Sequence, residues 1–281
     1  MTRTDVNEEN ELRARSYLYV PGDQPERLAG AHTRGADVLI VDLEDAVPAS
    51  RKEEARRVVV DWLSQYSAPV PVWVRVNPGE AGDADLRAIG ARPEVAGICL
   101  AKAESRASVE AVARALDAAG SRAVLAPILE TAVAVLNARD IASAARVVRL
   151  QIGEADLRAE LGIEPSPDEH EMLWVRSQVV LASAAAGIDA PLAPAATDFR
   201  DLDALRTSTD ALRRLGFSGR SCIHPAQVVV VNEVFTVGEA EFDAARTVLS
   251  LDEASGGAVT SDGAGHMIDE AVVRRARRLL G

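Results

Sequence analysis

The chain has 281 residues, 48% of them hydrophobic, which suits a single α/β barrel of the usual size of about 250 residues. Its formal net charge is −12, with 31 basic and 43 acidic residues and no basic stripe, which argues against a nucleic-acid partner. No apolar run approaches the roughly 20 residues of a membrane span, and the polar N-terminus lacks a secretory signal, so we expect a cytoplasmic protein without membrane contact.

Residues 1–13 are polar and acidic and predict a flexible tail. From residue 14 onward, short apolar runs rich in β-branched residues alternate with segments of helical periodicity. One of these helices, over residues 50–66, has Ser50 as its expected N-cap and Glu53 in capping-box position. The predicted strands are residues 16–22, 37–43, 70–76, 97–102, 123–129, 147–153, a weak seventh run at 188–193 with two prolines nearby, and 221–225.

Eight strands separated by helices predict an α/β fold of the (β/α)8 type, a TIM barrel over residues 14–238. The run at residues 226–235 has the composition of a strand, but its place after the eighth strand favours a helix. Residues 239–281 form a C-terminal extension, predicted as two helices joined by the Gly/Ser-rich loop SGGAVTSDGAG. Because the barrel is complete without this extension, we expect it to pack outside the barrel or to reach a neighbouring subunit.

Charged residues close many of the predicted strands, and the active site of a barrel lies at the carboxyl ends of its strands. Glu130 and Asp156 follow consecutive strands, with no His or Cys nearby. Two carboxylates suit a hard cation such as Mg²⁺ or Mn²⁺, which takes its other ligands from water or substrate oxygens. The alternative is that one or both carboxylates only cap the helix that follows, a role for which Asp156 is the better candidate.

Asp42, Glu44 and Asp45 crowd the end of the second strand, where like charges repel unless a cation neutralises them. They are candidates for holding metal-bound water. The alternative is ion pairing with Arg51 or Lys52 of the next helix.

Arg75 ends the third strand inside an apolar run. Burying an arginine there is energetically unfavourable unless its charge is paired. Its guanidinium group can bind a carboxylate or an enolate oxygen of a substrate. The alternative is that Arg75 forms a structural ion pair within the protein. Lys102 ends the fourth strand. It is expected to be a structural residue, with a Schiff-base nucleophile as the alternative. His224 follows the eighth strand, where it is expected to be a hydrogen-bonded core histidine or a residue that supports the site, with a general base as the alternative. Cys99 and Cys222 lie in apolar runs and predict small buried side chains.

Seven motifs occur in a fixed order: RSYLYVPG, DLEDAV, VRVN, LETA, GEADL, GRSCIHPAQ and DGAGHMID. In this order they resemble the HpcH/HpaI aldolase and citrate lyase β-subunit family over residues 15–280. The resemblance implies a TIM barrel with Mg²⁺ held by Glu130 and Asp156, and with Arg75 at the substrate carbonyl. It also implies that Asp269 serves as acid/base in a neighbouring subunit's active site, within a homotrimer or a hexamer.

The expected activity is a Mg²⁺-dependent carbon–carbon lyase acting on a 3-hydroxyacyl-CoA of the malyl-CoA or citramalyl-CoA type. Its small-molecule partners would be an acyl-CoA and a 2-oxo acid. One alternative keeps the site and changes the reaction, to malyl-CoA thioester hydrolysis or to the citrate lyase β role on an acyl-carrier-protein thioester. Another class of alternative is a non-catalytic barrel that binds a metabolite.

Overall fold

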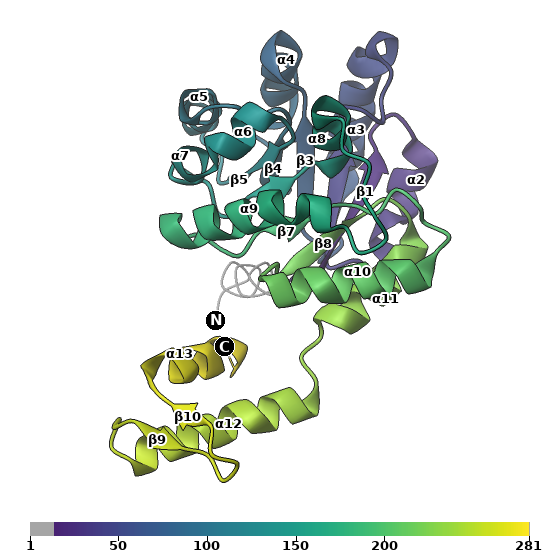
Figure 1. Ribbon diagram of the computed structural model, residues 1–281. Helices are drawn as coiled ribbons and strands as arrows, with labels where there is room; N and C mark the ends of the chain where they lie inside the picture. Colours follow the sequence, from purple (N-terminus) through teal and green to yellow (C-terminus); the bar gives the residue numbers. More distant parts are fainter. Residues whose placement is uncertain (1–13, 281) are drawn as a thin grey trace. The chain divides into compact units, whose positions relative to one another are not determined.

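The computed structural model describes residues 14–280, so the predicted N-terminal tail lies outside the described residues. Eight parallel strands close into a barrel in chain order (Figure 1). The strands are β1 Ser16–Pro21, β2 Val38–Asp42, β3 Val72–Val76, β4 Val95–Leu100, β5 Val124–Leu129, β6 Gln151–Ile152, β7 Leu192–Ala193 and β8 Gly219–Cys222. The barrel closes where β1 pairs with β8, and the predicted fold class is confirmed.

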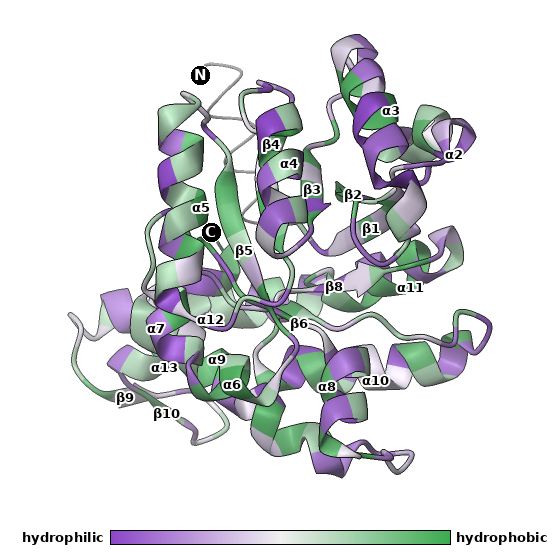
Figure 2. Ribbon diagram, turned by 90° about the horizontal axis from the view of Figure 1, so that it is seen from above, coloured by the Kyte–Doolittle hydropathy of each residue, from purple (hydrophilic) through white to green (hydrophobic). Residues whose placement is uncertain are grey.

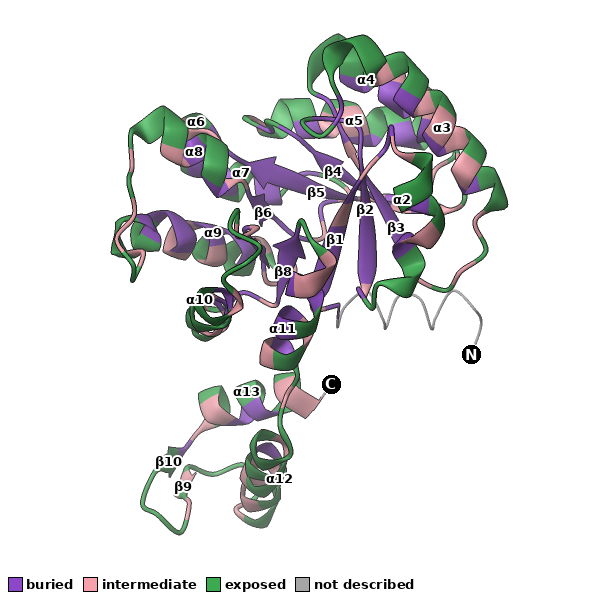
Figure 3. Cartoon of the chain, turned by 90° about the vertical axis from the view of Figure 1, so that its right-hand side faces the viewer, coloured by how far each residue is buried: buried purple, intermediate pink, exposed green. Residues whose placement is uncertain are grey.

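Helices follow the strands and cover the outside of the barrel (Figure 3). They are α2 Pro25–Gly30, α3 Lys52–Gln65, α4 Gly79–Ile89, α5 Arg106–Ala118, α6 Ala132–Leu136, α7 Ala138–Ala142, α8 Glu154–Leu161, α9 Leu173–Ala186, α10 Leu202–Leu215 and α11 Pro225–Phe235. Helices α3, α4 and α5 alternate between hydrophobic and hydrophilic colours in Figure 2, as amphipathic helices do on a sheet. The helical prediction for residues 226–235 is confirmed by α11.

The prediction of Ser50 as an N-cap is wrong. Ser50 lies inside a 3₁₀ turn, η2 Ala49–Arg51, and Arg51 is the residue that precedes α3. The turn begins early because Pro48 is extended and its carbonyl accepts the N–H of Arg51. The chain is therefore already helical where the side chain of Ser50 was expected to cap it.

Strand β2 shows how the barrel brings polar residues to one end. Val38 and Ile40 belong to the cluster inside the barrel, whereas Leu39 and Val41 belong to the cluster between strands and helices. Because side chains alternate along a strand, Asp42 continues the inward face. The inward face of β2 is thus apolar at its amino end and acidic at its carboxyl end.

The same alternation fills the amino-terminal half of the barrel with aromatic rings. Trp73 of β3 and Tyr17 of β1 meet edge to face, with ring centroids 6.0 Å apart. A β-carbon on Gly97 of β4 would stand 2.3 Å from the Trp73 ring, so only glycine leaves room for this indole. Toward the carboxyl ends of the strands, this layer is followed by the next inward-facing residues, such as Tyr19 of β1 and Asp42 of β2.

The described chain divides into two compact units, the first ending at Phe235 and the second beginning at Thr236. The second unit contains helix α12 Glu239–Ala254, strands β9 Thr260–Ser261 and β10 Met267–Ile268, and helix α13 Glu270–Leu280. The connection predicted as a loop therefore contains an antiparallel hairpin. Among residues 14–280, no helix is long and apolar enough to cross a bilayer.

Candidate active site

Arg75 at the end of β3 is held by the carboxylate of Asp42 on β2. Its Nε donates to Oδ1 at 2.7 Å and its Nη2 to Oδ2 at 2.5 Å, and both side chains are nearly buried. Its Nη1 lies 3.0 Å from an oxygen of Glu44 and 3.3 Å from one of Asp45. Burial opposes the charge of Arg75, but the hydrogen bonds and charge of Asp42 outweigh it, so the pKa of Arg75 lies above its usual value.

Arg75 is therefore the cation that neutralises the acidic group after β2. The expected alternative partners were wrong in both cases. Arg51 pairs with Asp23 and Glu54, and the ammonium of Lys52 donates to the backbone carbonyls of Leu43 and Glu44 and to Asn77. Lys52 thus supports the backbone beneath the acidic loop rather than its carboxylates.

Glu44 is the most perturbed carboxylate of this loop. It is buried, and its Oε2 accepts the N–H of Asp45 at 2.9 Å. Burial raises the pKa of Glu44 to about 7, against the opposing charge of Arg75, and the neighbouring Asp45 adds to the rise. A group with this pKa exchanges its proton close to neutral pH, and its contacts are with Arg75, the Asp45 side chain and the backbone.

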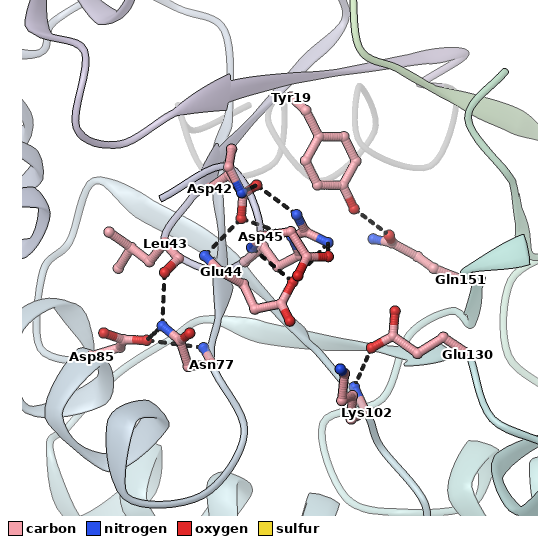
Figure 4. Close-up of polar contacts among 12 residues, drawn as sticks. Tyr19, Asp42, Leu43, Glu44, Asp45, Asn77, Asp85, Lys102, Glu130 and Gln151 are labelled. Atoms are coloured by element: carbon pink, nitrogen blue, oxygen red, sulfur yellow. Dashed lines mark hydrogen bonds and ion pairs between the residues drawn. The ribbon is translucent and has the colours of Figure 1, made fainter. Parts of the chain in front are cut away.

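Glu130 lies directly after β5, with its side chain buried. Its Oε1 accepts the backbone N–H of Lys102 at 2.6 Å (Figure 4). Burial raises the pKa of Glu130, the Lys102 N–H lowers it, and the charge of Asp156 raises it further. Within the described residues, Glu130 forms no ion pair with an arginine or a lysine. A bound cation would therefore stabilise this buried carboxylate.

Asp156 lies in the first turn of α8, the helix that follows β6, and its side chain is exposed. It does not precede α8 as an N-cap, because Gly153 occupies that position. Within residues 14–280 it makes no hydrogen bond or ion pair of its own. Its electrostatic effect on Glu130 indicates that the two carboxylates lie near each other.

Two residues of the site were missed by the sequence analysis. The Tyr19 hydroxyl donates to Oε1 of Gln151 at 3.1 Å, and Nε2 of Gln151 lies 3.0 Å from Sγ of Cys99. The ring of Tyr19 also lies against the Arg75 guanidinium, 5.1 Å from its centroid. Burial raises the pKa of Tyr19 well above its usual value, so this hydroxyl remains a neutral donor. Strand alternation was the available signal, since Tyr19 follows Tyr17 on the inward face of β1.

The cysteines have the buried, unreactive character that was predicted for them. Burial raises the pKa of both Cys99 and Cys222 to about 12, so each stays a thiol at neutral pH.

Lys102 contributes its backbone rather than its ammonium. Its φ of +49° places it in the left-handed region, which is uncommon for a residue other than glycine. This conformation turns its N–H toward Glu130, while its side chain is exposed. Strain at such a position is typical of functional sites.

His224 lies at the rim, where it is exposed and stacks on Phe199 with ring centroids 4.8 Å apart. Its Nδ1 accepts the N–H of Ala226. In the described part of the chain, no contact joins it to Glu130, Asp156 or Arg75. It is therefore not a core histidine, and the structure places it outside the carboxylate cluster.

Asp269 belongs to the second unit, at the start of α13. Its Oδ1 accepts the N–H groups of Ala271 and Val272 at 2.9 and 3.0 Å, as the carboxylate of a helix N-cap does. Within its own unit, Asp269 therefore has a capping role.

The site has few side chains that could bind a metal ion. Across residues 14–280, no three His, Cys, Asp or Glu side chains come together as a metal cluster. Glu130 and Asp156 remain as a pair of carboxylates. This donor set fits Mg²⁺, which binds through one or two carboxylates and keeps water or substrate oxygens as its other ligands. It does not fit zinc, whose sites use three or four His, Cys or carboxylate side chains.

Comparisons with known proteins agree with the motifs and the barrel. The family model described as HpcH/HpaI aldolase/citrate lyase matches residues 15–225. The chain is 36% identical over 280 residues to the citrate lyase subunit beta-like protein of Deinococcus radiodurans, covering 95% of this chain and 96% of that protein. It is also 36% identical over 245 residues to a (3S)-malyl-CoA thioesterase of Cereibacter sphaeroides, covering 85% of this chain and 84% of that one.

Among solved structures, the crystal structure of protein CitE from Mycobacterium tuberculosis in complex with magnesium, acetoacetate and coenzyme A is similar. It superimposes with a TM-score of 0.79 at 30% identity, over 96% of this chain and 98% of that chain. The family resemblance read from the motifs is confirmed. The chain belongs to the HpcH/HpaI aldolase/citrate lyase family and is thereby an enzyme of the lyase type.

Proposed function

We propose that this protein is a Mg²⁺-dependent carbon–carbon lyase for a 3-hydroxyacyl-CoA of the malyl-CoA or citramalyl-CoA type. It would release acetyl-CoA or propionyl-CoA and a 2-oxo acid, or join them in the reverse direction. The observation that carries the proposal is the buried Glu130 carboxylate beside Asp156, at the barrel end where Arg75 also lies. The magnesium, acetoacetate and coenzyme A of the CitE complex support the cofactor and the ligand class.

Glu130 and Asp156 would hold the Mg²⁺, with Mn²⁺ as a possible substitute. When bound, the ion would act as a Lewis acid and template for the oxygens of the 2-hydroxy or 2-oxo acid. The Lys102 N–H holds one oxygen of Glu130 in place, which leaves the other free for a ligand. The raised pKa of Glu130 means that binding a cation also removes the cost of burying its negative charge.

Arg75 would stabilise the negative charge that develops on the thioester oxygen. Asp42 grips it through two hydrogen bonds, so its guanidinium is oriented before the substrate arrives. A preorganised donor costs no reorganisation during the reaction. The neighbouring Tyr19 hydroxyl stays protonated and adds a polar, uncharged group beside Arg75.

The bond changes in the cleavage direction are as follows. A carboxylate, which we assign to Asp269 of a neighbouring subunit, takes the proton of the substrate hydroxyl. The O–H electron pair forms the carbonyl of the 2-oxo acid, and the carbon–carbon pair moves onto the α-carbon of the thioester as an enolate. Return of a proton to that carbon gives the acyl-CoA. This assignment requires an oligomer, for which we propose a homotrimer or a hexamer.

Thioester hydrolysis is the second candidate, favoured by the 36% identity to the malyl-CoA thioesterase. The citrate lyase β role, on a thioester of an acyl carrier protein, is a variant of the first reaction. Analysis of the products separates them. Free malate and CoA indicate hydrolysis, whereas a 2-oxo acid and an acyl thioester indicate cleavage.

The direct test offers the purified protein acetyl-CoA or propionyl-CoA with glyoxylate or pyruvate in the presence of Mg²⁺. Mass spectrometry should detect the condensed hydroxyacyl-CoA for at least one pair, and excess EDTA should abolish it. Full activity in EDTA would contradict the metal assignment. Release of free CoA together with the free hydroxy acid, malate in the case of glyoxylate, would favour the thioesterase.

A further inference from the structure

Helix α8, which carries Asp156, is held in place by the face opposite to Asp156. Glu154 and Asp156 are the first and third residues of α8. Because successive residues are about 100° apart around a helix, these two side chains point to nearly opposite faces. Glu154 is buried, while Asp156 is exposed and makes no polar contact of its own within residues 14–280. The direction of the Asp156 carboxylate therefore depends on the placement of α8.

Arg176 of α9 fixes the Glu154 face of α8. Its Nε donates to Oε1 of Glu154 at 2.6 Å, and its Nη2 donates to Oε2 at 2.8 Å. The two side chains are 7% and 8% exposed, so this two-pronged pair is shielded from water and from salt. A buried pair of this geometry holds its partners in one arrangement, and loss of one partner leaves the other charge uncompensated.

A second carboxylate holds Arg176 in turn. Nη1 of Arg176 donates to Oε2 of Glu169 at 2.8 Å, and the same oxygen accepts the Ser208 hydroxyl of α10. Glu169 has a φ of +54°, a left-handed conformation that the surrounding contacts must maintain. Arg176 is thus fixed from two sides and cannot swing away from α8.

The last turn of α8 is tied to the segment that follows Glu130. Oε2 of Glu160 accepts the N–H of Ala132 at 2.9 Å, and Ala132 begins α6, two residues after Glu130. Helices α6 and α8 lie side by side (Figure 3). The first turn of α8 is therefore held by Arg176, and its last turn is hydrogen-bonded to the segment that follows Glu130.

We propose that Arg176 is a positioning residue for the metal site, acting through Glu154 on α8 to set the Asp156 carboxylate against Glu130. This inference rests on the proposed function, in which Glu130 and Asp156 hold the cation. Residues that orient metal ligands without touching the metal commonly change affinity by about 10- to 100-fold when they are replaced. Arg176 should therefore affect metal affinity beyond its effect on stability.

The experiment compares three variants: Arg176→Met, which removes the fork; Arg176→Lys, which keeps the charge; and Glu154→Gln, which removes the partner's charge. Mn²⁺ binding is measured by electron paramagnetic resonance, and thermal unfolding is followed in EDTA. Arg176→Met should weaken Mn²⁺ binding about tenfold or more, with Arg176→Lys and Glu154→Gln in between. In the reaction, the KM for Mg²⁺ should rise more than kcat falls at saturating Mg²⁺.

The matched control is Arg15→Met. Arg15 makes a similar two-pronged pair with Asp37, at 2.9 and 3.0 Å, beside the start of β1 and therefore at the other end of the barrel. It should lower the melting temperature without changing Mn²⁺ affinity. If folded Arg176→Met binds Mn²⁺ as tightly as the parent, the positioning role is overturned.

Should Arg176→Met fail to fold, parental affinity in both Arg176→Lys and Glu154→Gln would overturn the positioning role equally. A parent protein that binds no Mn²⁺ would instead overturn the proposed metal site itself.

Discussion

Gly153 lies so close to Glu130 that a β-carbon at position 153 would stand 2.6 Å from Cβ and 2.7 Å from Oε2 of Glu130. Gly153 is the residue that links β6 to α8, immediately before the helix that carries Asp156. The backbone of one strand end thus packs against the carboxylate of its neighbour. Glycine at this position allows the two candidate metal ligands to approach each other.

We expect Gly153→Ala to displace the Glu130 carboxylate and to weaken Mn²⁺ binding more than tenfold. Overpacking of this kind costs about 1–3 kcal/mol, so the free energy of unfolding should fall as well. Calorimetric titration and urea unfolding measure the two effects. The control is Gly30→Ala, where the nearest described atom to the new β-carbon is 3.9 Å away. Unchanged Mn²⁺ affinity in Gly153→Ala would show that Glu130 is not a ligand or can relax freely.

Replacing Glu130 by Gln should separate binding from stability. The amide keeps the volume and can still accept the Lys102 N–H, but it removes a buried charge whose pKa is raised by burial. In EDTA, the variant should therefore be as stable as the parent at neutral pH, or more stable. Mg²⁺ binding and turnover should both be lost, with turnover falling at least about 100-fold. A variant that keeps Mg²⁺-dependent turnover would contradict the role of Glu130.

The barrel could be predicted because the periodicity of strands and helices is local in the sequence. So could the charged residues at the carboxyl ends of its strands. Charged residues that end apolar runs indicate the end of a barrel where ligands bind. The pairing of Asp42 with Arg75 was not predictable in the same way. These residues are register partners on β2 and β3, and register depends on how two separate strands align.

Two further details depend on conformation rather than composition. The role of Lys102 requires a left-handed backbone that turns its N–H to Glu130, whereas its residue type drew attention to its ammonium. The β9–β10 hairpin has two-residue strands within a Gly-rich segment, too short for a periodic pattern to appear.

Glu44 should make the stability of the metal-free protein depend on pH. Burial raises its pKa from 4.5 to about 7, so the folded protein binds this proton more tightly than the unfolded chain. Its contribution is full below about pH 4.5 and is lost as pH rises through about 7. This loss is at most about 3.5 kcal/mol, since one pKa unit corresponds to about 1.4 kcal/mol.

The Glu44→Gln variant should lack that component. We expect the difference between its urea unfolding free energies at about pH 5 and about pH 8 in EDTA to be smaller than the parent's. Glu53→Gln serves as the control, since Glu53 is 80% exposed and should leave the difference unchanged. An equal pH dependence in parent and Glu44→Gln would mean that Glu44 does not titrate in this range.

The assignment of Asp269 is tested with a substitution that keeps the helix cap. Because Asp269 caps α13, an alanine would cost about 1 kcal/mol of helix stability, whereas asparagine retains an oxygen that accepts the same N–H groups. Asp269→Asn should therefore fold and bind Mn²⁺ like the parent, while its turnover falls at least about 100-fold. Analytical ultracentrifugation should show the parental oligomer.

Mixed oligomers then decide which subunit Asp269 serves. Chains with Asp269→Asn are co-expressed in equal amounts with chains carrying Glu130→Gln, and tagged mixed species are purified. If each site combines Glu130 of one subunit with Asp269 of a neighbour, about one third of the sites in the purified mixed trimers receive both intact residues, and turnover returns in proportion. If Asp269 acts within its own chain, every site lacks one of the two groups and no activity returns. Absence of rescue in verified mixed oligomers, or a fully active monomer, would exclude the shared site.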